Sequence, residues 1–74
     1  MRHGKLFYDF ELDRLNIAFE DGGYGDGFHC GDILEVYDPQ DGHWKERRLE
    51  YDHNRDEWYF AGFGAIPVGT KIRV

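Results

Sequence analysis

Residues 6–19 of the chain are LFYDFELDRLNIAF. In the second half of this segment, Leu15, Ile17 and Phe19 alternate with polar or small residues, which is typical of a β-strand with one buried face. In the first half, Tyr8-Asp9 closes an apolar run, and an Asp at such a position hydrogen-bonds backbone N–H groups two residues further on. The segment therefore predicts two short strands joined by a turn over residues 9–14.

The pattern of a Tyr-Asp pair followed by a second Asp recurs at a spacing of 43 residues, and a shorter version lies between the two copies. The members are Tyr8, Asp9 and Asp13, then Tyr37, Asp38 and Asp41, then Tyr51, Asp52 and Asp56. We interpret the repetition as one hairpin chemistry used three times. Convergent turn chemistry explains it better than duplication, because two full copies are too few for a repeat architecture.

Period-two alternation also occurs at residues 34–36, 58–61 and 72–74, and no segment keeps a helical spacing of apolar residues. Glycine-rich and proline-containing turns separate the runs at residues 21–32, 38–42, 52–56 and 64–69. We therefore expect one all-β domain over residues 1–74, either a small barrel of five or six strands or a strongly bent antiparallel sheet. Its expected core is Leu6, Leu15, Ile17, Phe19, Leu34, Val36, Leu49, Trp58, Phe60, Ile72 and Val74.

The chain is acidic, with a net charge of −6. Residues 1–44 hold 10 acids and 3 bases, whereas residues 45–74 hold 5 acids and 6 bases. This balance argues against direct nucleic-acid binding, which needs Lys and Arg facing the phosphates. We expect no signal peptide and no membrane span, and the single cysteine, Cys30, favours a reducing cytoplasm.

Four segments, in order along the chain, resemble the Src-homology-3 family. LFYDFE at 6–11 is similar to its first strand and acidic loop, and GDILEV at 31–36 to the strand after its diverging turn. DGHWK at 41–45 is similar to the turn before its groove tryptophan, and Ile66-Pro67 to its groove proline. The resemblance implies a five-stranded β-barrel.

The chain also resembles a family of short uncharacterised bacterial domains that often occur on mobile elements. The resemblance is carried by Tyr8-Asp9, HCGD at 29–32, Tyr51-Asp52, DEWY at 56–59 and IPVG at 66–69. It implies no known activity. It does imply a context in which small acidic proteins bind and block larger ones.

Four patterns that suggest reactive or ligand chemistry have simpler explanations. His29 and Cys30 are neighbours on an extended chain and point to opposite faces, so a catalytic pair is not expected. The histidines lack zinc-finger spacing, and a calcium loop starting at Asp9 has Arg14 where glycine is required. The glycines of residues 22–27 precede no Lys-Ser/Thr and no helix. We predict no enzymatic activity, catalytic residue, cofactor or metal.

Aromatic residues are the best functional lead, because the chain has more of them than its core needs. The surplus is Tyr8, Phe10, Tyr24, Phe28, Tyr37, Trp44, Tyr59 and Phe63. Exposed aromatics bordered by acids favour a protein or peptide partner. We expect a module that binds a protein or a basic peptide segment through Tyr8, Phe10, Glu11, Asp13, Asp41, Trp44 and Pro67.

The alternative hypothesis is an inhibitor that mimics nucleic acid. In that case the acidic first half would occupy the basic channel of an enzyme that handles DNA or RNA, and binding would weaken steeply with salt.

Overall fold

The structure is a computed structural model that describes residues 1–67 and 69–74, so Val68 of the IPVG motif lies outside the described residues. Its strands are β1 (His3–Asp9), β2 (Arg14–Phe19), β3 (Ile33–Asp38), β4 (His43–Asp52), β5 (Glu57–Phe60), β6 (Gly64–Ala65) and β7 (Lys71–Arg73). They form one antiparallel sheet in the order β2-β1-β7-β3-β4-β5-β6. The prediction of an all-β fold is confirmed.

The sheet differs from the predicted barrel in strand number and in closure. It has 7 strands rather than five or six, and β2 and β6 are its open edges. The additional strand, β6, follows a turn over residues 61–63, in which Gly62 has a φ of 80° and the Phe63 backbone nitrogen donates to the Phe60 carbonyl at 2.9 Å. The turn lets Gly64 pair with Phe60 and Ala65 with Tyr59. Glycine has no side chain to contribute to an alternating pattern, so the sequence shows no sign of this strand.

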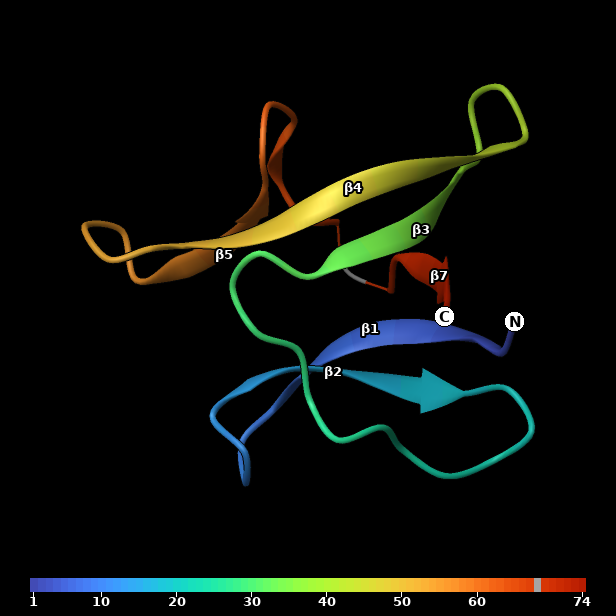
Figure 1. Ribbon diagram of the computed structural model, residues 1–74, viewed down its shortest axis with the longest axis horizontal. Coiled ribbons are helices and arrows are strands. Elements are labelled where there is room, and N and C mark those ends of the chain that lie inside the picture. The colour runs from blue at the N-terminus through green and yellow to red at the C-terminus, as the bar shows by residue number, and fades with distance from the viewer. Residues whose placement is uncertain (68) are drawn as a thin grey trace.

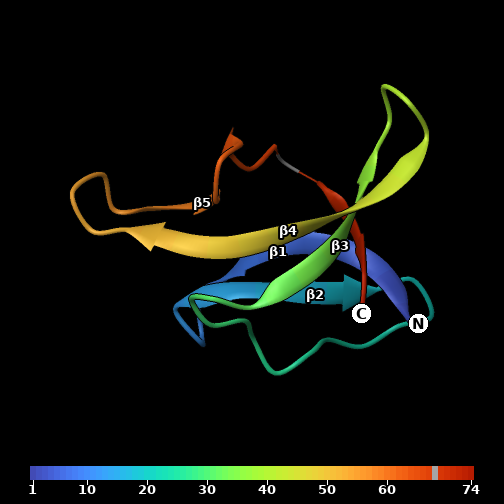
Figure 2. The same ribbon diagram turned by 45° about the horizontal axis from the view of Figure 1, so that its top comes forward.

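The sheet curves so that its two ends lie in different layers. β4 pairs with β3 through His43–Arg48 and with β5 through Leu49–Asp52, so it belongs to both halves of the sheet. Figures 1 and 2 show β4 and β5 above β1 and β2, with β7 beside both chain ends. Two backbone hydrogen bonds hold the chain ends together: the Arg2 nitrogen donates to the Val74 carbonyl at 2.6 Å, and the Val74 nitrogen donates to the Arg2 carbonyl at 2.9 Å. In the described part of the chain, no helix is long and apolar enough to cross a membrane.

The core lies between these layers and matches most of the expected set. Its buried members are Leu6, Leu15, Ile17, Leu34, Val36, Leu49, Phe60 and Ile72. Phe19 and Trp58 are only partly buried against it, and Val74 is 41% exposed. The prediction for Val74 is wrong: its backbone pairs with Arg2 beyond the end of β7, and its side chain is not covered by the core.

Three hairpins share the turn chemistry that the Tyr-Asp pattern predicts. Asp9 Oδ1 accepts hydrogen bonds from the backbone N–H groups of Glu11 (3.0 Å) and Leu12 (3.3 Å). Asp52 Oδ1 does the same for Asn54 (2.9 Å) and Arg55 (3.2 Å). The β3–β4 turn is capped in the same way by Asp38 Oδ1, 2.9 Å from the backbone nitrogen of Gln40.

The last residue of each turn has a left-handed backbone. Asp13 and Asp56 both have a φ of 54°, and Gly42 has a φ of 73°. Asp and Asn tolerate this region better than most side chains, and glycine adopts it without strain. The counterpart of Asp13 in the β3–β4 turn is therefore Gly42. The shorter sequence pattern had suggested Asp41, which is wrong.

One buried polar residue, Asn16, fastens the glycine-rich loop to β2. It is 1% exposed, and its amide nitrogen donates to the Gly25 carbonyl at 2.8 Å and to Asp9 Oδ2 at 3.1 Å. Its amide oxygen accepts from the backbone nitrogens of Ile17 (2.8 Å) and Gly27 (3.0 Å). Asn16 thus connects the loop to the carboxylate that caps the β1–β2 turn.

Candidate functional site

A cleft of about 920 Å³ opens at the end of the core, between the β1–β2 hairpin and the β4–β5 hairpin. Its apolar lining includes Leu6, Leu15, Ile66 and Pro67. Its aromatic and acidic lining comprises Tyr8, Tyr51 and Trp58 with Asp13, Asp56 and Glu57. The cleft therefore combines apolar surface, aromatic rings and carboxylates.

On the β1 side, strand periodicity brings Tyr8 into the cleft. Leu6 is a core residue, and Tyr8 lies two positions further along the same face. The Tyr8 hydroxyl donates a hydrogen bond to Asp13 Oδ1, and its ring meets Phe10 edge-on with ring centres 4.9 Å apart. The left-handed backbone of Asp13 ends the turn that returns this carboxylate to Tyr8.

The acidic surroundings keep the Tyr8 phenol protonated. The hydrogen bond to Asp13 raises the pKa of Tyr8 above its usual value of 10.0, because an ionised phenol could no longer donate to that carboxylate. Partial burial and the charge of Asp13 act in the same direction, followed by the charge of Asp56. Asp56 belongs to the second hairpin, which lines the same cleft as Tyr8.

The same periodicity operates on the β4–β5 side. Leu49 pairs with Phe60 in the core, and two residues outward Tyr51 pairs with Trp58. The rings of Tyr51 and Trp58 lie 5.2 Å apart at an interplanar angle of 61°. The core thus continues into the cleft as an aromatic pair.

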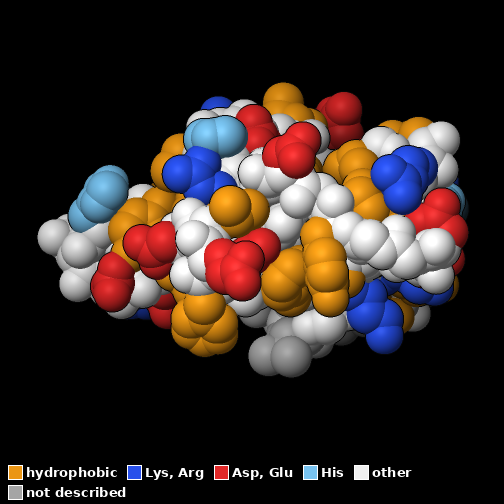
Figure 3. Space-filling model, turned by 90° about the horizontal axis from the view of Figure 1, so that it is seen from below, with side chains coloured by type: hydrophobic (Ala, Val, Ile, Leu, Met, Phe, Trp, Pro, Cys, Tyr) orange, Lys and Arg blue, Asp and Glu red, His pale blue; other side chains and the backbone are white. Residues whose placement is uncertain are grey.

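The fold brings the two full copies of the 43-residue pattern to one place, because both Tyr8 and Tyr51 and both Asp13 and Asp56 line the cleft. Figure 3 shows red carboxylates among orange apolar side chains toward the left of the view, the side on which both hairpins lie in Figure 1. Aromatic faces and carboxylates both attract cations, so the arrangement suits a basic side chain with an apolar stem.

Comparison with known proteins assigns the family. Residues 4–74 match the family described as domain of unknown function DUF5348. The chain belongs to this family. No curated protein matches the DUF5348 chain. A crystal structure of a protein from Ruminococcus gnavus is similar to it, with 32% sequence identity, a TM-score of 0.78, and coverage of 99% of this chain and 100% of that one.

The predicted binding residues of this DUF5348 chain fall into two groups. Tyr8, Asp13 and Pro67 line the cleft. Phe10 contacts Tyr8 and is 87% exposed, and Glu11 is exposed in the same turn. Phe10 and Glu11 therefore lie in the turn beside the cleft and do not line it.

Trp44 lies elsewhere, on the outer face of the sheet. It packs edge-on against Tyr37 and His3, with ring centres 5.4 and 5.2 Å away, and the Arg73 guanidinium stacks over its ring at 4.3 Å. Trp58 is the tryptophan of the cleft. The predicted grouping of Trp44 with Tyr8 and Pro67 is therefore wrong.

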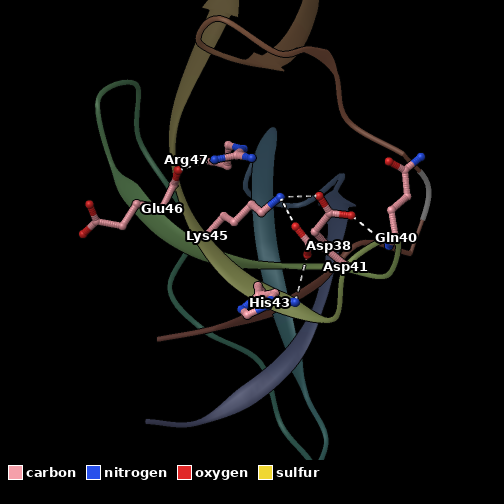
Figure 4. A network of polar contacts seen from close by, with 7 residues as sticks. All are labelled: Asp38, Gln40, Asp41, His43, Lys45, Glu46 and Arg47. Atoms are coloured by element: carbon pink, nitrogen blue, oxygen red, sulfur yellow. Dashed lines mark hydrogen bonds and ion pairs between the residues drawn. The ribbon is translucent and has the colours of Figure 1, made fainter.

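Asp41 also lies apart from the cleft, in the β3–β4 turn. Its carboxylate pairs with Lys45 Nζ at 2.6 Å, and Asp38 pairs with the same ammonium at 2.8 Å. Figure 4 shows the Lys45 side chain ending between the two carboxylates. These contacts lower the pKa values of Asp38 and Asp41 and raise that of Lys45. Asp41 is thus already neutralised by its own chain.

Three cleft residues were not among the predicted binding residues: Tyr51, Asp56 and Trp58. The 43-residue pattern already marked Tyr51 and Asp56 as counterparts of Tyr8 and Asp13, and this signal could have identified them. Alternation at residues 58–61 places Trp58 on the same face as the core residue Phe60 and so predicts that it is buried. It does not show whether that face is still covered at the end of the sheet.

The His29-Cys30 segment forms a turn, as its sequence suggests. The backbone nitrogen of His29 donates to Asp32 Oδ2 at 2.8 Å, and the backbone nitrogen of Asp32 donates to the His29 carbonyl at 3.1 Å. Cys30 is exposed beside the cleft. Within residues 1–67 and 69–74, no three His, Cys, Asp or Glu side chains are grouped closely enough to hold a metal ion.

Proposed function

We propose that this protein is a non-enzymatic binding module whose cleft takes a basic segment of another protein. The observation that carries the proposal is that both Tyr/Asp hairpins line one cleft. An arginine or lysine entering between Asp13 and Asp56 would meet two carboxylates and the rings of Tyr8 and Trp58. Hydrogen bonds between charged partners and contacts between cations and aromatic rings both favour this placement.

Two of the three acids of the cleft are available to a partner, whereas the third, Glu57, pairs with Arg55. Neither Asp13 nor Asp56 forms an ion pair within residues 1–67 and 69–74, whereas Asp38 and Asp41 bind Lys45 and Glu35 binds Arg73. An unpaired carboxylate keeps its attraction for a cation supplied by a partner. The cleft is therefore the acidic site best suited to recognition.

The shape of the partner follows from the shape of the cleft. Its lining runs from the β1–β2 hairpin past Ile66 and Pro67 to the β4–β5 hairpin, so an extended segment fits better than a compact one. Extended proline-rich peptides are bound in grooves lined by aromatic residues, and this cleft is lined by Tyr8, Tyr51 and Trp58. We include proline-containing basic peptides among the candidate partners.

The alternative, an inhibitor that mimics nucleic acid, has less support. A mimic needs a continuous array of free negative charge. Here Lys45 is shared by Asp38 and Asp41, and Arg73 binds Glu35, so two cations offset part of the charge of three acids that would contribute to it.

The experiment uses the fluorescence of Trp58. Replacing Trp44 by Phe leaves Trp58 as the single tryptophan, and this reporter lines the cleft. We expect a short extended peptide containing arginine to change the Trp58 emission. The same peptide with citrulline, which keeps the shape and loses the charge, should bind about tenfold or more weakly, because a charge-assisted hydrogen bond contributes about 1.5–3 kcal/mol.

Matched Asp→Asn variants locate the binding surface. Asp13→Asn and Asp56→Asn should each weaken peptide binding about tenfold, and asparagine also tolerates their left-handed backbone. The control is Asp21→Asn in the exposed turn after β2, whose carboxylate is 72% exposed and pairs with Arg2. Equal effects of all three substitutions, or no response of Trp58 to any basic peptide, would contradict the proposal.

A further inference from the structure

The outer face of β1 and β7, on the other side of the sheet from the core, gathers basic residues. The register sets His3 opposite Arg73 and Lys5 opposite Lys71. Directly opposite residues share a face, and Gly4 and Ile72 between them are buried on the inner face. Two neighbouring cross-strand pairs therefore place four nitrogen-bearing side chains together on the outer surface.

The lysine pair is unusual, because like charges directly opposite each other on a sheet are destabilising. Both Lys5 and Lys71 are exposed, and neither forms an ion pair within residues 1–67 and 69–74. Arg73 differs, since its guanidinium binds Glu35 at 3.0 Å. An anionic ligand bound across the two lysines would remove their mutual repulsion.

Aromatic rings border this basic strip on both sides. Lys71 Nζ lies 5.5 Å from the Tyr37 ring centre, and the Tyr37 ring contacts Trp44 further along the face. On the side of β2, the Phe7 ring lies 5.5 Å from that of Tyr24, which is 71% exposed. Rings next to ammonium groups on an open sheet face are suited to stacking bases and holding phosphates at the same time.

We propose that this outer face is a second binding surface and that it takes single-stranded nucleic acid. Phosphates contact Lys5 and Lys71, and bases stack on Tyr24 and Tyr37. The net charge of −6 led to the opposite expectation because it adds up residues of both faces. The acids that line the cleft belong to the core side of the sheet. On the outer face, Glu35 binds Arg73 and Glu46 lies opposite Glu35 on the next strand. The residues opposite Lys5 are Ala18 and Lys71, so no acid faces this lysine across the strands. The other occupant that the charge would suit is an acidic protein segment.

The test measures fluorescence anisotropy of a labelled thymidine 12-mer at about 50 mM salt. Low salt is chosen because binding to phosphates strengthens as the salt concentration falls. Two competitors carry the same negative charge: a strand of abasic spacers with equal phosphates, and a glutamate peptide. We expect the abasic strand and the peptide to bind about tenfold or more weakly, because stacking of one base contributes roughly a tenfold change or more. If either competitor binds as tightly as the thymidine 12-mer, the assignment to nucleic acid is overturned.

Single-charge variants test the lysines. Lys5→Gln and Lys71→Gln should each weaken binding about fivefold to tenfold at this salt concentration and reduce the slope of log affinity against log salt by about 0.7. The control, Arg55→Gln, removes one charge from the β4–β5 turn, where the side chain is 76% exposed. It should change affinity by less than about twofold.

A Tyr24→Ser variant tests stacking separately from charge. It should lower affinity about tenfold without changing the salt slope, and Tyr24 is exposed enough for the fold to tolerate the change. The proposal is overturned if the 12-mer does not bind, or if Arg55→Gln weakens it as much as Lys71→Gln does. Because the cleft is not involved, Asp13→Asn should leave strand binding intact.

Discussion

Substitution of Asn16 by Asp tests whether the buried amide organises both the glycine-rich loop and the β1–β2 turn. The two side chains have nearly the same shape, and Asp keeps an oxygen for the backbone nitrogens of Ile17 and Gly27. The change replaces the donor nitrogen by a second oxygen. That oxygen then faces the Gly25 carbonyl and the Asp9 carboxylate, the two acceptors that the amide held at 2.8 and 3.1 Å.

The expected loss of unfolding free energy is about 3 kcal/mol at neutral pH. Leaving a buried polar group without its hydrogen-bond partner costs about 1–3 kcal/mol. In the variant, the Gly25 carbonyl loses its donor, and the new carboxylate oxygen has no donor in its place. A domain of this size has a total stability of roughly 4–11 kcal/mol. The variant should therefore keep roughly 1–8 kcal/mol of stability, so it still folds and the loss can be measured.

Urea unfolding followed by tryptophan fluorescence measures this loss. The control is Asn54→Asp, which makes the same chemical change in the exposed β4–β5 turn and should alter stability by less than about 0.5 kcal/mol. The folded protein holds the new carboxyl at position 16 in a buried place beside Asp9, which raises its pKa and favours its protonated form. The deficit should therefore shrink as the pH falls from 7 towards 5. A loss below about 1 kcal/mol, or a deficit that does not change with pH, would refute the reasoning.

Three further predictions concern the core and the β3–β4 turn. Leu49→Ala should cost about 2–5 kcal/mol in urea unfolding, because Leu49 is 0% exposed and a cavity would remain. Gly42→Ala should cost about 1–2 kcal/mol, since its φ of 73° is unfavourable for a side chain. The pKa values of Asp38 and Asp41 are lowered mainly by Lys45, so the stability that they contribute is present above about pH 4 and lost as the pH falls through their folded values. Lys45→Met should therefore flatten the acid side of a stability profile measured by thermal unfolding.

Local chemistry explains why so much of the fold could be predicted. Asp9, Asp38 and Asp52 cap turns through their own backbone neighbours, so these turns are visible in the sequence without knowledge of the rest of the molecule. Alternation in the strands likewise identified most of the core. It failed for Val74 and Trp58, which lie where the sheet no longer covers the face they share with the core.

The candidate site depended on long-range arrangement. The sequence showed that Tyr8 and Tyr51 belong to equivalent turns, but their meeting across one cleft results from the curvature of the sheet at β4. The same curvature separates Trp44 from Tyr8, although the sequence resemblance placed both in one groove.

The sequence by itself therefore determined an all-β chain with three Asp-capped hairpins, because capping and alternation involve residues a few positions apart. The tertiary structure decided which hairpins face each other, which acids are neutralised and on which face the lysines gather. These properties depend on strand order and register, which bring Lys5 to Lys71 and Asp13 towards Asp56. Pairing between distant strands is set by the packing of the whole core and not by any one segment.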